Sequence, residues 1–238
     1  MKNILVTICS RGGSQGIPKK NIKKINGVPL IAFSINMAQS ISKKWNTDIA
    51  LSSDDKEIIS IAEEYGIKTE YIRPAHLASS TSGKIDVLKN ILSYTKERKQ
   101  KEYDYIIDLD VTSPLRTLID IENAFNLLQE SDAYNIFSVS KANRNPYFNM
   151  VEKNDNGFVS LVKSNDSFLT RQDAPEVYDM NASFYIYRNI FFEMDIKTSV
   201  SEKSLAYVMN HICFDIDEPI DFQIMEFLIS NNHLGFEL

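Results

Sequence analysis

The sequence predicts an α/β fold in which helices cover both faces of a doubly wound, mostly parallel sheet. Short apolar runs such as Ile4–Cys9 are typical of strands buried on both faces, and they alternate with segments whose apolar residues recur at helical spacing. A glycine-rich loop, Ser10–Gly16, follows the first of these runs. The 238 residues suffice for one such domain with a substantial core, so we expect residues 1–238 to form a single domain.

The first half of the chain predicts repeated strand–helix units. Three helices are indicated by helical spacing of apolar residues, which are Leu30, Phe33, Met37 and Ile41, then Ile58, Ile61, Ala62 and Tyr65, then Ile85, Leu88 and Leu92. Between these helices, apolar and β-branched runs predict the strands Asp48–Ser52 and Thr69–Ile72. Gly66 stands where a glycine C-cap would end the second helix. This alternation is what a doubly wound sheet requires.

The second half continues with the strand Tyr105–Leu109, a helix bearing Ile121, Phe125 and Leu128, and the strand Asn135–Val139. Helical spacing then lapses over residues 140–175. The turn Asn154–Gly157 lies between two short apolar segments and is typical of a β-hairpin. We interpret this region as a small dimerisation insert, with Tyr147 and Phe148 as exposed aromatic residues of the interface.

The chain is expected to return to the sheet near its end. Met180–Tyr187 is rich in aromatic and β-branched residues and predicts a strand, and Ile212–Phe214 predicts a further short one. A closing helix is indicated by Phe222, Met225 and Ile229, with Pro219 in its first turn.

Acidic residues outnumber basic ones, with 32 Asp and Glu against 26 Lys and Arg, and the net charge is -6. This balance disfavours broad electrostatic binding to nucleic acid. Basic residues nevertheless gather near the N-terminus, at Arg11, Lys19, Lys20, Lys23 and Lys24. Such a local cluster in an acidic protein indicates a small anionic ligand.

Targeting signals and reactive cysteines are not indicated. The N-terminal stretch lacks the apolar segment and cleavage site of a signal peptide, and no run approaches the roughly 20 apolar residues of a membrane span. We therefore expect a cytoplasmic protein that does not bind membranes. Cys9 and Cys213 lie in apolar runs without a C-x-x-C partner and are interpreted as small buried hydrophobic residues. The three histidines are scattered, without metal-binding spacing.

The loop Ser10–Gly16 has the composition of a phosphate-binding loop. Its glycines allow backbone N–H groups to approach a ligand, and Arg11, Lys19 and Lys20 add positive charge. A Walker A loop is unlike this one, because Gly16 is followed by Ile17-Pro18 instead of Lys-Ser/Thr. The dinucleotide fingerprint is only partly matched. A glycine-rich surface turn with solvated lysines remains the alternative from composition alone.

Carboxylates follow two further predicted strands. In open parallel sheets ligands bind outside the carboxyl ends of the strands, where Asp54 and Asp110 would lie beside the first loop. Asp108, inside its strand, is interpreted as a paired structural carboxylate. Asp215 and Asp217 alternate on a predicted extended backbone, so their carboxylates could address one hard cation such as Mg²⁺. An ordinary surface strand end is the alternative for this pair.

Several separated segments resemble, in order, the motifs of the CMP-sialic acid synthetase family. They are Arg11-Gly12-Gly13-Ser14 with Lys20-Asn21, Arg73-Pro74 with Leu77-Ala78, Thr112-Ser113-Pro114-Leu115-Arg116, Arg171-Gln172 with Asn181-Ala182-Ser183-Phe184-Tyr185, and Asp215-Ile216-Asp217. The family consists of cytidylyltransferases that activate nine-carbon 2-keto sugar acids. The resemblance implies a Rossmann-like nucleotidyltransferase fold and a homodimer, with CTP and such an acid as substrates.

The resemblance also implies roles for individual residues. CTP would be bound by Arg11, Gly12, Gly13, Ser14, Lys20, Asn21, Arg73, Ser80 and Ser82, and Mg²⁺ by Asp215 and Asp217. The sugar acid would be bound by Asp110, Thr112, Ser113, Arg171, Gln172, Asn181 and Ser183, with the Arg171 fork facing its carboxylate. The residues implied to act in catalysis are Arg11, Lys20 and Asp217.

Two departures from the family pattern bear on the substrate. Sialic acid enzymes usually carry Gln-Pro where this chain has Asp110-Val111, a form similar to relatives that act on legionaminic acid, and Ser80 stands where an aspartate is expected. The resemblance therefore implies CMP transfer from CTP to the C2 hydroxyl of N,N'-diacetyllegionaminic acid, with release of pyrophosphate. The alternatives are the same reaction on N-acetylneuraminic, pseudaminic or Kdo acid, or a non-catalytic nucleotide-binding module.

Overall fold

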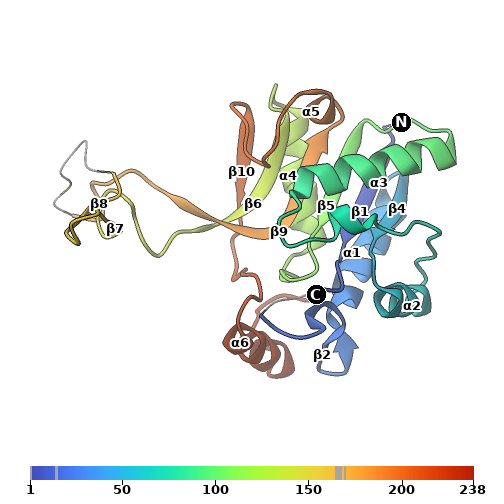
Figure 1. The fold of residues 1–238 in the computed structure, drawn as a ribbon, viewed down its shortest axis with the longest axis horizontal. Coiled ribbons are helices and arrows are strands. Elements are labelled where there is room, and N and C mark those ends of the chain that lie inside the picture. Colours follow the sequence, from blue (N-terminus) through green and yellow to red (C-terminus); the bar gives the residue numbers. More distant parts are fainter. Residues whose placement is uncertain (1, 14–15, 164–167, 169) are drawn as a thin grey trace.

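A computed structural model describes residues 2–13, 16–163, 168 and 170–238. Its main sheet has six strands, which are β1 (Ile4–Cys9), β4 (Thr47–Ser52), β5 (Tyr105–Leu109), β6 (Asn135–Lys141), β9 (Tyr178–Arg188) and β10 (Ser204–Val208). They lie in the order β10-β6-β9-β5-β1-β4 (Figure 1). All run in one direction except β9, which is antiparallel to both of its neighbours. The predicted mostly parallel sheet is confirmed.

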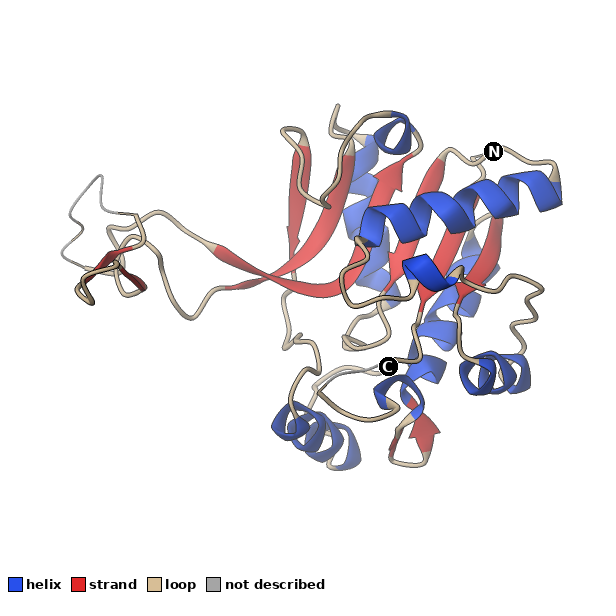
Figure 2. Ribbon diagram, in the orientation of Figure 1, coloured by secondary structure: helices blue, strands red, loops and turns tan. Residues whose placement is uncertain are grey.

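Helices cover both faces of this sheet (Figure 2). One face packs against α1 (Leu30–Lys44) and α4 (Leu118–Gln129), and the other against α3 (Lys84–Lys99) and the short α5 (Ile190–Glu193). Neighbouring residues of a strand point to opposite faces of the sheet, so Ile107 packs in the core on the first face and Ile106 in the core on the second. None of the helices that the structure describes is long and apolar enough to cross a membrane.

Capping residues explain where several helices begin. Asp55 accepts hydrogen bonds from the backbone N–H groups of Glu57 and Ile58 at the start of α2 (Lys56–Glu64). Thr117 and Asp120 form a capping box on α4, and Pro219 opens α6 (Pro219–Ser230) in the first turn. The five helices expected from apolar spacing are therefore all present.

Two predicted strands are wrong, and one strand of the main sheet was missed, as were the short strands β2 (Lys24–Ile25) and β3 (Val28–Pro29). Thr69–Ile72 forms no strand and joins no sheet, and Ile212–Phe214 is irregular. The true last strand is Ser204–Val208, which pairs parallel with β6. Apolar runs of three or four residues do not distinguish a strand from a buried loop, because pairing depends on which neighbours the chain meets.

The pairing of β9 with β6 contains a local irregularity. The pairing of β6 with β9 shifts register between Phe137 and Val139, and opposite this point Ala182 has a φ of 59°, in the left-handed region. Ser138 Oγ fills the gap by donating to Asn181 Oδ1 at 2.6 Å and accepting from the Phe184 N–H at 3.1 Å. Beyond the irregularity, β6 and β9 leave the sheet together as a twisted ribbon.

Residues 142–177, which we call the arm, extend from that ribbon well away from the rest of the molecule (Figure 1). The arm carries a small antiparallel hairpin of β7 (Val151–Lys153) and β8 (Val159–Leu161). The hairpin predicted around Asn154–Gly157 is thus confirmed. Tyr147 and Phe148 are half-buried, however, and the exposed apolar residues are instead Met150, Val151, Phe158 and Val159.

Smaller elements complete one end of the sheet. The carboxyl ends of β1, β4 and β5 meet there, beside the short helix η1 (Lys20–Ile22), the hairpin of β2 (Lys24–Ile25) and β3 (Val28–Pro29), and the short helix η2 (Ala75–Leu77). Helix α6 packs against β2 at the same end. The fold therefore gathers loops from both ends of the chain around one edge of the sheet.

Candidate active site

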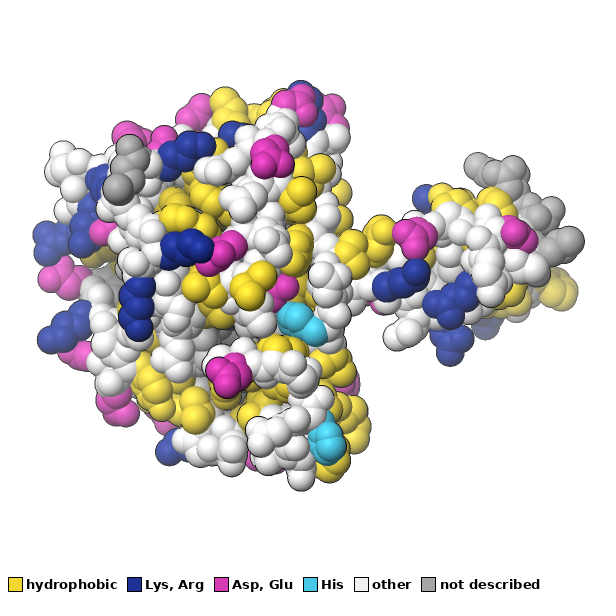
Figure 3. Space-filling model, turned by 180° about the vertical axis from the view of Figure 1, so that it is seen from behind, with side chains coloured by type: hydrophobic (Ala, Val, Ile, Leu, Met, Phe, Trp, Pro, Cys, Tyr) yellow, Lys and Arg dark blue, Asp and Glu magenta, His cyan; other side chains and the backbone are white. Residues whose placement is uncertain are grey.

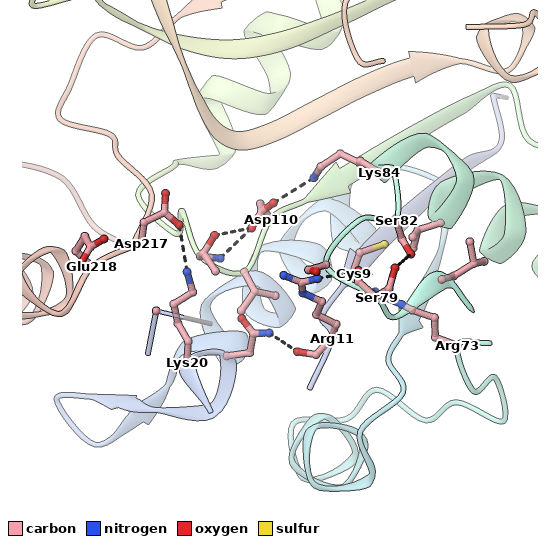
Figure 4. Close-up of a pocket in the computed structure, with 17 residues that line it drawn as sticks. Cys9, Arg11, Lys20, Arg73, Ser79, Ser82, Lys84, Asp110, Asp217 and Glu218 are labelled. Carbon is pink, nitrogen blue, oxygen red and sulfur yellow. Dashed lines mark hydrogen bonds and ion pairs between the residues drawn. The ribbon is translucent and has the colours of Figure 1, made fainter. Parts of the chain in front are cut away.

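A cavity of about 700 Å³ opens at the carboxyl ends of β1 and β5 (Figure 4). It is lined by side chains from the first loop, the segment before α3, the loop after β5 and the segment before α6, among them Arg11, Lys20, Asn21, Arg73, Ser80, Ser82, Asp110, Thr112 and Asp217. The predicted residues in this set come from across the chain, and the fold brings them together. A cavity of this size, lined by cations and a few carboxylates, suits a polar, anionic ligand.

The N-terminal loop and the C-terminal segment meet at this cavity. Lys20 Nζ lies 3.3 Å from Asp217 Oδ1 and also donates to the backbone carbonyl of Ile216. A Cβ at Gly16 would overlap the backbone oxygen of Asp217, so the close passage of the two segments requires glycine at this position. The Lys20 side chain is mostly buried while that of Asp217 is 72% exposed, which leaves the carboxylate free to bind a further group.

The first loop is held in place by side chains on both sides. The Gly12 N–H donates to Asp54 Oδ1 at 3.0 Å, and Asn21 Nδ2 donates to the Arg11 carbonyl at 2.9 Å. A Cβ on Gly12 would lie 2.6 Å from a carboxylate oxygen of Asp55, whereas one on Gly13 would meet no atom of the described residues within 4 Å. Packing against the described residues therefore requires glycine at position 12. The predicted ligand Ser14 lies outside the described residues.

The opposite wall is formed by residues 73–82. Arg73 is buried and donates to Ser52 Oγ at 2.9 Å and to the Ser52 carbonyl at 2.7 Å, which fixes its guanidinium at the end of β4. Arg11 Nη1 reaches across to the Ser79 carbonyl at 2.8 Å. Ser80 and Ser82 both line the cavity, as the resemblance implied for a nucleotide-binding segment.

A charged cluster that sequence reasoning missed lies at the end of β5. Lys84, from the first turn of α3, places Nζ 2.9 Å from Asp108 Oδ2 and 3.1 Å from Asp110 Oδ2 (Figure 4). Burial opposes the charge of Lys84, but the two carboxylates outweigh it and raise its pKa well above the ordinary value. Burial likewise opposes the charge of Asp110, and Lys84 with the Thr112 N–H lowers the pKa of that carboxyl.

One signal could have identified Lys84. A lysine directly after a helix-starting glycine is opposed by the positive end of the helix dipole, so such a residue needs a partner elsewhere. The expectation that Asp108 is a paired structural carboxylate is confirmed by this contact and by a 2.8 Å hydrogen bond from Thr7 Oγ1.

Behind the cavity wall, Arg116 organises a buried network. Its guanidinium donates to the carbonyls of Asp110 at 3.0 Å, Ser113 at 2.8 Å and Ser183 at 2.6 Å. Ser113, Asn181 and Ser183, predicted to contact the sugar acid, are buried in this region with their polar groups bonded to other protein groups. None of the three lines the cavity, so in this structure they support its wall instead of facing it.

Asp215 and Asp217 form the carboxylate pair expected to hold Mg²⁺. Burial and the neighbouring Asp217 charge raise the pKa of Asp215. Asp217 lines the cavity, whereas Asp215 is not among the residues that line it. Among the residues that the structure describes, no cluster of three or more acidic, histidine or cysteine side chains forms a closed metal cage. Two carboxylates suit Mg²⁺, which commonly keeps waters and takes its other ligands from substrate phosphates.

Arg171 and Gln172 do not reach the cavity of their own chain. They lie on the arm beside a separate hollow of about 390 Å³, where Arg171 Nη2 donates to the Ala142 carbonyl at 3.0 Å.

The two cysteines are free, and Cys213 is buried as predicted. Cys9 is half-buried and lines the cavity, and burial raises the pKa of its thiol.

The chain is similar to known proteins over nearly its whole length. The model of the cytidylyltransferase family matches residues 5–234. The chain is 41% identical over 235 residues to CMP-N,N'-diacetyllegionaminic acid synthase of Campylobacter jejuni, covering 99% of this chain and 98% of that protein. It is 40% identical over 234 residues to the post-translational flagellin modification protein B of Campylobacter coli, covering 98% of each chain.

A solved structure shares the fold. The structure of CMP:2-keto-3-deoxy-manno-octonic acid synthetase, complexed with CTP, superposes with a TM-score of 0.68 at 16% identity, covering 98% of this chain and 100% of that one. The family match over residues 5–234 and two relatives at 40% and 41% identity lead to one conclusion, which is that the chain belongs to the cytidylyltransferase family.

Proposed function

We propose that this enzyme transfers CMP from CTP to the C2 hydroxyl of a nonulosonic acid, N,N'-diacetyllegionaminic acid, and releases pyrophosphate. The observation that carries the proposal is the meeting of Lys20 with Asp217 at a cavity that Arg11 and Arg73 also line. The choice of sugar is supported by the 41% identity to the legionaminic acid synthase of Campylobacter jejuni. It is also supported by Asp110-Val111, the departure from the sialic acid pattern.

In this reaction the C2 hydroxyl oxygen attacks the α-phosphorus of CTP. A new O–P bond forms, the bond from the α-phosphorus to the α,β-bridging oxygen breaks, and the hydroxyl proton passes to a base or to water. Negative charge grows on the α-phosphate oxygens and on the departing pyrophosphate. Arg11, Lys20 and the amides of the first loop would stabilise that charge, because fixed donors in a cavity need little reorganisation.

A buried, unsatisfied acceptor supports ligand binding at the same loop. Asn21 is 6% exposed, and its Oδ1 has no hydrogen-bond partner in the described part of the chain. Buried polar atoms are nearly always bonded, so an orphan at a cavity wall is a candidate for a ligand hydroxyl or amine. The predicted role of Asn21 in CTP binding accounts for this atom.

Asp215 and Asp217 would hold Mg²⁺, whose charge would screen the phosphates of CTP. The exposure of Asp217 and its contact with Lys20 support this role. Lys20 would then both pair with the metal-binding carboxylate of Asp217 and stabilise the negative charge of the phosphates. Among the described residues no group of three or more acidic, histidine or cysteine side chains is arranged to hold a metal ion, so the remaining ligands would come from CTP and water.

We further propose that two chains pair through their arms, and that Arg171 and Gln172 approach the cavity of the partner subunit. The support is that both residues lie on the arm, away from their own cavity, and that exposed apolar side chains cover the hairpin beside them. Arg171 would then face the sugar carboxylate in the partner's cavity. We also keep the prediction of a cytoplasmic location. Both cysteines are free, which suits a reducing compartment.

The decisive experiment measures pyrophosphate release from CTP and Mg²⁺ with N,N'-diacetyllegionaminic, N-acetylneuraminic, pseudaminic and Kdo acids in parallel. We expect the highest kcat/KM with the legionaminic acid. A clear preference for another acid would replace the proposed sugar while keeping the reaction. Tight CTP binding without turnover on any of the four acids would favour a non-catalytic nucleotide-binding protein instead.

A further inference from the structure

Lys84 occupies a position that helix formation does not explain. It is the first residue of α3, directly after Gly83, where the helix dipole opposes a positive charge. Its contacts explain the placement, because Nζ lies 2.9 Å from Asp108 Oδ2 and 3.1 Å from Asp110 Oδ2. The ring of Tyr185 packs against the same ammonium, with its centroid 4.5 Å from Nζ.

The two carboxylates that Lys84 joins have different surroundings. Asp108 is fully buried, and its Oδ1 accepts from Thr7 Oγ1 at 2.8 Å, so its contacts described here lie inside the protein. Asp110, two residues further along the chain, lines the cavity. Alternate residues of an extended strand point to the same side, which is why one lysine can reach both. Lys84, which itself lines the cavity, thus links an internal carboxylate to one that faces the cavity.

The orientation of Asp110 is fixed from two directions. Its Oδ1 accepts from the Thr112 N–H at 3.0 Å and from Thr112 Oγ1 at 2.9 Å, while its Oδ2 accepts from Lys84. The Thr112 bonds come from its own loop, and the Lys84 bond comes from a separate helix. A carboxylate held in this way is preorganised and keeps one lone pair, on Oδ2, for a ligand.

We propose that Lys84 is a positioning residue for the sugar acid, which it serves by holding the Asp110 carboxylate toward the cavity. Asp110 can only accept hydrogen bonds, so it would bind an N–H or O–H donor of the sugar. It would also repel the carboxylate of the sugar acid, which must then lie away from the β5 wall. This inference rests on the proposed function, because it assumes that the acceptor is an anionic sugar.

Four variants test the role of Lys84. Lys84→Met removes the ammonium, and Asp110→Asn removes the charge that it positions. The double variant Lys84→Met/Asp108→Asn also removes the buried charge, so that folding is not lost through an unpaired internal carboxylate. Lys89→Met is the matched control, since Lys89 lies on the same helix outside the cavity. For each variant we would measure kcat, KM for the sugar acid and, by calorimetry, the affinity for CTP.

We expect KM for the sugar acid to rise on the order of tenfold in the double variant and in Asp110→Asn, as for one lost charge-assisted hydrogen bond. CTP affinity should stay near wild type, and Lys89→Met should change neither quantity. If the double variant keeps the wild-type KM, Lys84 only neutralises Asp108 and the inference is overturned. Absence of wild-type turnover on any sugar acid would instead reject the proposed function, and this inference with it.

Discussion

The main body of the molecule, which contains the cavity, differs from the arm in how its side chains are partnered. In the body, cations and carboxylates from distant segments are already paired, as Lys20 is with Asp217 and Lys84 with Asp110. In the arm, Phe158 is 74% exposed and Val159 63% exposed, and a narrow neck connects the arm to the body (Figure 3). The chain therefore forms its cavity from its own segments, whereas the arm exposes an apolar surface that the proposed pairing of two chains would cover.

We expect the stability of the body to depend strongly on Arg116. Because Arg116→Met would leave the carbonyls of Asp110, Ser113 and Ser183 without this donor, we expect a loss of roughly 4 kcal/mol in the free energy of unfolding. Urea unfolding followed by circular dichroism would measure it. Arg98→Met, at an exposed ion pair with Glu70, is the control and should cost little. Equal stability of the two variants would show that the body does not depend on this network.

Catalysis should depend on the meeting of the two chain ends. Asp217→Asn keeps the shape of the side chain but removes the charge beside Lys20, and we expect kcat to fall on the order of 10²-fold, with Arg11→Ala similar. Steady-state pyrophosphate release measures this effect. Asp195→Asn, at an 88% exposed carboxylate, is the matched control. Wild-type turnover by a folded Asp217→Asn variant would remove Asp217 from the proposed mechanism.

Substitutions in the arm should change self-association and leave the stability of the body unchanged. Replacing the exposed Phe158 by Asp is expected to weaken self-association on the order of tenfold or more, while the melting temperature of the body hardly changes. Light scattering across a concentration series measures the association. Asp155→Ser, in the turn of the same hairpin, should leave it unchanged. A wild-type protein that stays monomeric at micromolar concentration would reject the proposed dimer.

The smallest expected effect concerns Asp120, at the start of α4. Burial opposes its charge, but the Thr117 hydroxyl and His211 lower the pKa of the carboxyl below its ordinary value. A lowered pKa stabilises the fold above the unfolded-state value near 4 and loses that contribution as pH falls through the folded-state value. Asp120→Asn should therefore cost about 1 kcal/mol at pH 7 and less near pH 3. Stability curves at both pH values would show whether the difference narrows as expected.

Sequence patterns anticipated the regular parts of the fold because long periodic segments report burial directly. The helices bearing Leu30, Ile85 and Phe125 formed as expected, and so did the strands Ile4–Cys9 and Tyr105–Leu109. Short apolar runs are less informative, since Thr69–Ile72 has the composition of a strand but forms none, whereas Ser204–Val208 pairs with β6. Only the neighbours that a segment meets in space decide whether it pairs.

For the site, residue identity determined the chemistry that the chain offers. The glycine-rich loop with Arg11 and Lys20, and the acids Asp215 and Asp217, can be read directly from the sequence. The tertiary structure alone decided which of these groups meet. In the fold Lys20 contacts Asp217, and Lys84 contacts Asp110. Asn181 and Ser183 are buried behind the cavity wall. Arg171 lies on the arm, away from the cavity. The physical reason is that charge and hydrogen-bonding capacity belong to a side chain, whereas distance, burial and partners belong to the fold.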